Sequence, residues 1–184
     1  MDLHRSHPGV DVQVWAQDEG RLGLKPIVRR VWSPRGVRPI AMQRRRYKWL
    51  YVYAFVRPDT GDTFWLLLPT ASTEAFSIAL EEFAQHVGAG PDLRIALVID
   101  GAGWHTSSHL RIPDGVHLIF QPPYSPELQP VERVWTLLNE PIANRTFRDL
   151  DELQDVAVHR CRQLAASNDL IRKHTCFYWW KEAL

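Results

Sequence analysis

Three acidic residues lie where a folded chain can bring them together. Asp18 ends the alternating segment VDVQVWAQD, and Asp100 directly follows the apolar segment RIALVI. Glu132 falls in the first turn of an expected helix, 32 residues after Asp100. Neighbouring carboxylates repel one another unless a cation neutralises them, and their hard oxygens favour Mg²⁺ or Mn²⁺ over zinc. The pattern predicts a divalent-metal site made by Asp18, Asp100 and Glu132.

The segments that would position these acids predict an α/β sheet of mixed direction. Alternating apolar residues are typical of a half-buried strand, and continuous apolar runs are typical of a strand covered on both faces. Three antiparallel strands followed by a strand–helix–strand unit give a five-stranded mixed sheet. We expect strands at 10–18, 94–99 and 116–120, a hairpin over 49–69, a short strand at 26–32, helices over 72–87, after 130 and over 149–166, and a short helix near Thr106.

Four prolines precede Glu132 in the segment FQPPYSPELQPVERVW. Each restricts a backbone dihedral, which reduces the entropy lost when the start of the helix is held in place. Gln129 is a poor N-cap, so Pro130 is expected to begin the helix. The alternative is a surface loop before an amphipathic helix with an exposed Glu132. The prolines are Pro122, Pro123, Pro126 and Pro130.

The first acid has a neighbour of the same chemistry. Glu19 follows Asp18 in QDEG, a sequence that would also suit an ordinary turn. Alternation along a strand places Glu19 on the face opposite Asp18. We therefore prefer Asp18 as the ligand.

The charge distribution predicts a polyanionic partner. The net charge is +1, yet residues 21–48 contain ten Lys or Arg and no Asp or Glu. A solvated surface is the alternative, but so many uncompensated cations beside Trp32, Tyr47 and Trp49 favour a phosphate backbone. The cations expected to contact DNA are Arg29, Arg30, Arg35, Arg38, Arg44, Arg45, Arg46 and Lys48.

Composition limits the remaining possibilities. The 184 residues, 45% of them hydrophobic, fit one globular domain. No apolar run approaches the ~18 residues of a membrane span, and the N-terminus lacks the apolar core of a secretory signal. Cys161 and Cys176 form no metal or redox motif and are expected to be free thiols in a reducing cytosol. His105 and His109 have zinc-motif spacing without the required glutamate, so zinc is set aside.

The segments QDEG, VIDGAGWHTS and PPYSPELQPVERVW resemble the three signature blocks of DDE superendonuclease transposases, bacterial insertion-sequence enzymes related to the mariner elements. The resemblance extends from about residue 12 to residue 150. It implies an RNase H-like catalytic domain over 1–148, with 21–48 as a DNA-contacting insertion and 149–184 as a C-terminal helical extension. The family usually has asparagine at the positions of Gln129 and Gly101, so the local geometry is expected to differ there.

The resemblance also implies a mechanism and partners. Asp18, Asp100 and Glu132 would hold two Mg²⁺ or Mn²⁺ ions that support cleavage of transposon ends and strand transfer by in-line attack. His105 would orient the scissile phosphate or a water, or hydrogen-bond Asp100, although a packing role is equally open. Tyr124 and Ser125 would approach the DNA backbone, although Tyr124 also suits packing against the turn.

The resemblance implies a homodimer acting on double-stranded DNA, and relatives normally carry an N-terminal helix-turn-helix module. We expect that module to be missing here, either because this is a separately encoded or excised catalytic half or because a second polypeptide supplies recognition. A bacterial cytoplasmic, nucleoid-associated location follows from that role. Two alternatives stay open, an RNase H-like nuclease acting on hybrids or branched DNA, and a non-catalytic DNA-binding module derived from a transposase.

Overall fold

The computed structural model describes residues 9–37, 47–123, 125–178 and 180. Five strands form one mixed sheet in the order β3-β2-β1-β4-β5. β1 pairs antiparallel with β2 and parallel with β4, and β5 continues the parallel half. This is the mixed five-stranded sheet that the sequence predicts. The strands are β1 Asp11–Gly23, β2 Trp49–Arg57, β3 Asp62–Leu68, β4 Leu93–Ile99 and β5 Val116–Phe120.

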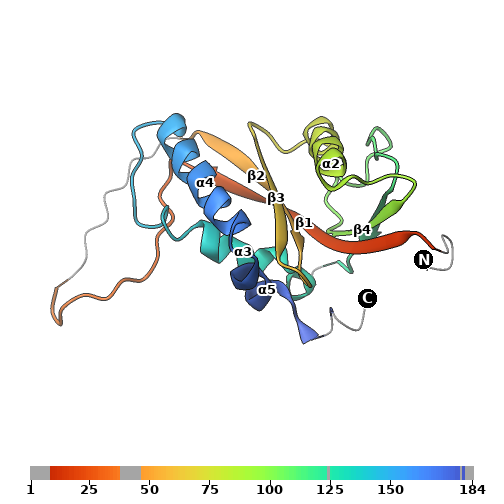
Figure 1. Cartoon of the computed structure of the whole chain (residues 1–184). Helices are drawn as coiled ribbons and strands as arrows, with labels where there is room; N and C mark the ends of the chain where they lie inside the picture. The colour runs from red at the N-terminus through yellow and green to blue at the C-terminus, as the bar shows by residue number, and fades with distance from the viewer. Residues whose placement is uncertain (1–8, 38–46, 124, 179, 181–184) are drawn as a thin grey trace.

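Helices cover both faces of the sheet (Figure 1). One face packs against α2, which follows the β2–β3 hairpin, and the other packs against α3, α4 and α5. The hairpin turns at Gly61, whose φ of 84° favours glycine. A short 3₁₀ helix, η1, precedes α3. The helices are α2 Thr73–Val87, η1 Pro126–Leu128, α3 Val131–Leu138, α4 Leu150–Ala165 and α5 Asn168–Thr175.

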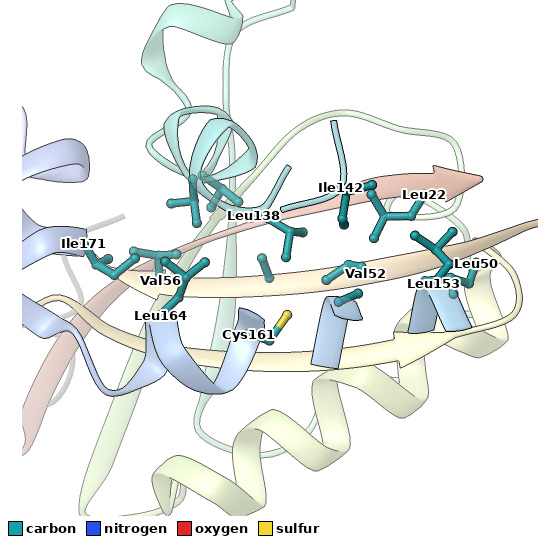
Figure 2. Packing of buried hydrophobic residues seen from close by; sticks show 14 of the residues in the cluster. Leu22, Leu50, Val52, Val56, Leu138, Ile142, Leu153, Cys161, Leu164 and Ile171 are labelled. Carbon is teal, nitrogen blue, oxygen red and sulfur yellow. The ribbon is translucent and has the colours of Figure 1, made fainter. Parts of the chain in front are cut away.

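The larger core lies between the sheet and the three later helices (Figure 2). Ala16, Val52 and Val56 from the strands meet Leu138 of α3 and Leu164 of α4, and each is essentially inaccessible to solvent. Trp180 packs into the same core, so this C-terminal aromatic contributes to folding of the domain.

The second core lies between the sheet and α2. Phe55 stacks on Phe83 with ring centroids 4.3 Å apart, and Trp15 meets Phe83 edge-on. Ser72 caps α2 by accepting a hydrogen bond from the backbone N–H of Ala75. Each face of the sheet therefore has its own apolar layer.

Three local expectations are wrong. β1 continues past Asp18 to Gly23, because β2 pairs with it throughout that stretch. The described segment 24–37 forms no strand, since β2 and β4 occupy both edges of β1 and Pro26 and Pro34 lack the N–H that pairing requires.

The short helix expected near Thr106 is absent as well. Residues 101–115 form turns, in which the Ser107 hydroxyl accepts a hydrogen bond from the backbone N–H of His109. Such side-chain contacts with the backbone compete with helical hydrogen bonds.

The two cysteines are free thiols, as expected. Cys161 is buried in the larger core, and burial raises the pKa of its thiol to about 12. Within the described part of the chain, every helix is too short or too polar to cross a membrane.

Candidate active site

The register of the parallel strands places two of the predicted acids side by side. Ala16 of β1 is the partner of Val98 in β4; Asp18 lies two residues further along β1, and Asp100 directly follows the last residue of β4. Both side chains line a cavity of about 450 Å³, and Glu132 of α3 lines it as well. Three acids from three separate elements thus reach one cavity.

The proline-rich loop lines the same cavity and is braced at both ends. The Gln121 side chain donates to the carbonyl of Leu128 (3.0 Å), which closes the loop on itself. The buried Gln129 side chain donates to the carbonyl of Gln17 (2.9 Å), which ties the start of α3 to β1 directly beside Asp18. Pro130 is the N-cap residue of α3 and has no capping side chain, whereas Oε1 of Gln129 accepts a long hydrogen bond from the backbone N–H of Val131 (3.5 Å). Gln129 therefore ties the start of the helix to β1.

The Asp18 carboxylate is fixed by two hydrogen bonds. Its Oδ1 accepts from the backbone N–H of Glu19 (2.8 Å), and its Oδ2 accepts from the indole N–H of Trp135 (2.8 Å). Burial raises the pKa of Asp18 from 3.8 to about 7; the Trp135 hydrogen bond opposes this shift, and the charges of Glu132 and Glu19 add to it. Two neighbouring acids thus add to the effect of burial on Asp18.

Gly20 leaves room for the indole that holds Asp18. A Cβ at this position would lie 2.8 Å from the Cζ3 atom of Trp135. We expect Gly20→Ala to lower the free energy of unfolding by about 1–3 kcal/mol, because the ring must move out of a packed layer. Urea unfolding measures the change, and Gly90→Ala, whose Cβ meets nothing within 4 Å, is the matched control. Equal stability of the two variants would contradict this reading of the packing.

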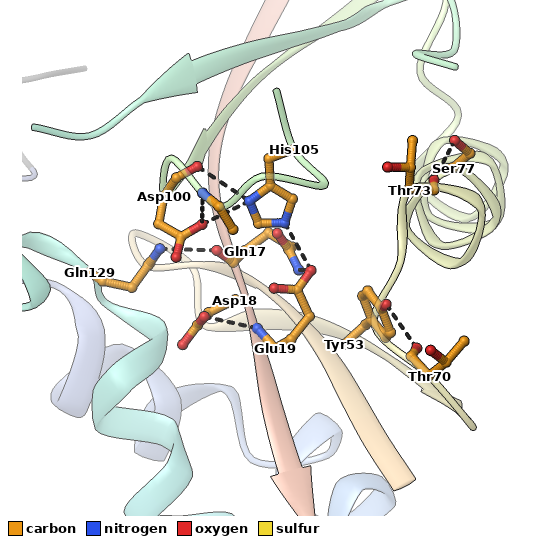
Figure 3. A network of polar contacts seen from close by, with 11 residues as sticks. Gln17, Asp18, Glu19, Tyr53, Thr70, Thr73, Ser77, Asp100, His105 and Gln129 are labelled. Carbon is orange, nitrogen blue, oxygen red and sulfur yellow. Dashed lines mark hydrogen bonds and ion pairs between the residues drawn. The ribbon is translucent and has the colours of Figure 1, made fainter. Parts of the chain in front are cut away.

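Asp100 is held by its own loop (Figure 3). Its Oδ1 accepts from the backbone N–H of Ala102 (3.1 Å) and lies 2.7 Å from Nδ1 of His105. The other ring nitrogen, Nε2, lies 2.9 Å from Oε1 of Glu19. Burial lowers the pKa of His105, but the hydrogen bond and charge of Glu19, with a contribution from Asp100, outweigh it and raise the pKa overall. His105 therefore links the acids at positions 19 and 100.

The donor set fits a hard divalent cation. All three acids line one cavity, and carboxylate oxygens are the ligands that hard divalent cations prefer. In the part of the chain that the structure describes, no three His, Cys, Asp or Glu side chains are yet grouped closely enough to hold an ion.

Other predicted residues are distributed more widely. Ser125 lines the cavity, whereas Tyr124 lies outside the described residues. The Arg29 guanidinium donates to the carbonyl of Thr136 (2.9 Å), which ties it to α3. The side chains of Arg30, Arg35 and Lys48 are exposed, and Arg38, Arg44, Arg45 and Arg46 lie outside the described residues.

Sequence reasoning missed two contributors to the site. Glu19 lies on the face of β1 opposite Asp18, as expected, and contacts His105 there. The Gln129 side chain connects the start of α3 to β1. Alternation predicted where Glu19 points, but the sequence holds no signal that a loop from the end of β4 would meet it there.

The mixed sheet in the order β3-β2-β1-β4-β5, with helices on both faces, is an RNase H-like fold. The sequence matches the DDE superfamily endonuclease family over residues 13–154, and the chain belongs to that family.

Known proteins are similar to this chain in sequence or in fold. An uncharacterized protein of Sinorhizobium fredii, y4pE/y4sA, is 40% identical over 124 residues, which are 67% of this chain and 86% of that protein. The Mos1 strand transfer complex is similar in fold with a TM-score of 0.56 at 12% identity, covering 90% of this chain and 55% of the Mos1 chain. The mariner Mos1 paired end complex with Mg has a TM-score of 0.59 at 15% identity, covering 89% and 51%. The chain thus spans about half the length of these Mos1 chains.

Proposed function

We propose that this chain is the catalytic domain of a transposase that cleaves DNA strands at transposon ends and joins them to target DNA. The convergence of Asp18, Asp100 and Glu132 on one cavity, in a member of an endonuclease family, carries the proposal. The fold similarity to Mos1 transposase complexes supports the choice of reaction.

The three carboxylates would hold two Mg²⁺ or Mn²⁺ ions, the metals present in Mos1 paired end complexes of similar fold. When bound, such ions supply activation of the attacking oxygen and stabilisation of the leaving oxygen. Asp18 and Asp100 provide oxygens from the rigid sheet, and Glu132 provides them from α3. Ser125, at the rim of the cavity, is placed to contact a DNA backbone.

The segment between β1 and β2 would hold DNA. Figure 1 shows its described residues 24–37 extending away from the sheet. Arg30 and Arg35 are exposed, and Trp32 is fully accessible to solvent. Exposed cations next to an exposed aromatic ring suit a phosphate backbone and its bases. Arg29, whose guanidinium is bound to α3, would anchor the base of this segment.

A salt titration tests the DNA-binding role. We expect the double variant Arg30→Ala/Arg35→Ala to weaken duplex binding and to lower the slope of log affinity against log salt by about two, because each phosphate contact contributes ~0.9. Fluorescence anisotropy measures the slope on a labelled duplex. The control removes two exposed arginines elsewhere, Arg111 and Arg162. An equal fall in slope for both double variants would show that only net charge matters.

A substrate panel tests the proposed activity. Mn²⁺-dependent nicking of plasmid DNA that leaves 3′-hydroxyl ends supports a transposase-type site. Cleavage confined to RNA–DNA hybrids or branched DNA would favour the RNase H-like nuclease instead. A folded protein that shows no Mn²⁺ binding by calorimetry in the millimolar range would favour the non-catalytic module.

Two predictions about partners come from the family resemblance alone. We propose that the active form is a homodimer on double-stranded DNA, and that a helix-turn-helix module recognises the transposon ends. Binding by this chain alone should then show little sequence preference.

A further inference from the structure

A buried imidazole joins Glu19 to the candidate site. The side chains of His105 and Glu19 are 1% and 5% exposed, whereas the Asp100 side chain is 54% exposed. His105 therefore lies with one ring nitrogen on an interior carboxylate and the other on a carboxylate that opens into the cavity (Figure 3).

The two contacts of this ring lie on opposite sides of it. Nε2 meets Glu19 on the interior side and Nδ1 meets Asp100 on the cavity side, both within hydrogen-bond distance. Glu19 thus holds the interior side of the ring whose other side holds Asp100.

The surroundings leave the ring and Glu19 little freedom. Phe76 of α2 lies against the ring, with centroids 4.3 Å apart. The side chain of Gln17 also donates to Oε1 of Glu19 (3.1 Å). Glu19 is absent from the cavity lining that Asp18 and Asp100 share. Glu19 therefore contacts the residues around the cavity and does not itself face the proposed metal site.

We infer that Glu19 is a positioning residue that orients Asp100 through His105. By holding Nε2, it fixes the plane of the ring and so directs Nδ1 at Oδ1 of Asp100. Oδ1 also accepts from Ala102, so within the described chain Oδ2 is the oxygen left without a hydrogen bond and available to an ion. This inference rests on the proposed function, since it assigns Asp100 the role of a metal ligand.

Variants of Glu19 test the inference. Glu19→Ala removes the acceptor, and we expect Mn²⁺ affinity and nicking rate each to fall about 10- to 100-fold, the usual effect of losing the partner that orients a ligand. Glu19→Gln places an amide oxygen where the carboxylate oxygen was, so Mn²⁺ affinity and nicking rate should both return to within about threefold of wild type. Asp11→Asn, an exposed acid at the start of the same strand, is the control and should change neither.

The geometry of the ring gives an independent readout in metal-free protein. Crystal structures of the metal-free wild type and Glu19→Gln should show the contacts of His105 with both position 19 and Asp100, whereas Glu19→Ala should show the ring turned away from Asp100. A wild-type crystal structure without the bridge would overturn the inference, as would a folded Glu19→Ala with wild-type Mn²⁺ affinity and nicking, or equal losses in the Ala and Gln variants. If wild type bound no Mn²⁺, the proposed function would fail, while the metal-free structures would still report whether His105 bridges the two acids.

Discussion

Asp100→Asn should reduce metal-dependent strand cleavage by at least about a thousandfold, equivalent to roughly 4 kcal/mol of transition-state stabilisation. The amide oxygen can take the place of Oδ1 and keep the bonds from Ala102 and His105. The amide NH₂ then replaces Oδ2, and a group that only donates hydrogen bonds offers no lone pair to a cation. The substitution therefore removes the ligand while preserving the loop around it.

Three measurements separate this effect from general damage. Nicking rates give the loss of activity, anisotropy in metal-free buffer should show duplex affinity within about twofold of wild type, and thermal unfolding should be nearly unchanged because the side chain is half exposed. Asp92→Asn, at an exposed acid just before β4, controls for loss of one charge. Retained Mg²⁺-dependent cleavage in Asp100→Asn would falsify the assigned role.

Asp18 should make the metal-free protein less stable as pH rises. Its pKa is about 7 in the folded state and near 3.8 when the chain is unfolded. Between these values the folded state binds more protons than the unfolded state, so this contribution to stability is fully present below about pH 4 and is lost once the pH passes about 7. The shift corresponds to at most about 4 kcal/mol.

Comparison with Asp18→Asn isolates that contribution. The variant cannot titrate at this position, so relative to wild type it should gain about 2–3 kcal/mol between about pH 5 and about pH 8. Urea unfolding in the presence of a chelator, at both pH values, measures the difference. Only the pH-dependent part is diagnostic, because the amide must give up one of the two hydrogen bonds that Asp18 accepts. Parallel pH profiles for the two proteins would show that Asp18 titrates normally in the folded state.

Divalent cations should offset the loss of stability that ionisation of Asp18 causes. Mn²⁺ favours the ionised carboxylate, so its stabilising effect on wild type should increase from about pH 5 to about pH 8. Asp18→Asn should show little of this increase. The ionised Asp18 carboxylate thus destabilises the metal-free domain and is the form that binds a cation.

Most of the sheet followed from local patterns. Continuous apolar runs gave β4 and β5, a turn at Gly61 gave the hairpin, and Ser72 with Gly88 bounded α2. These features are decided by side-chain period and backbone preference within a few residues. Where the outcome depended on neighbours, local patterns failed, as in the extension of β1 along β2 and the absence of a strand at 26–32.

By itself the sequence determined which acids are candidates, because Asp18 and Asp100 follow strands and Glu132 begins a helix after a braced loop. Tertiary structure decided how they are held. Parallel pairing of β1 with β4 brings the chain ends that carry Asp18 and Asp100 to the same edge of the sheet, and Gln129 ties α3 to β1. Trp135 donates a hydrogen bond to Asp18, more than a hundred residues earlier in the chain, and His105 contacts Glu19 on β1. Such contacts depend on the relative placement of whole elements, which strand and helix periods do not encode.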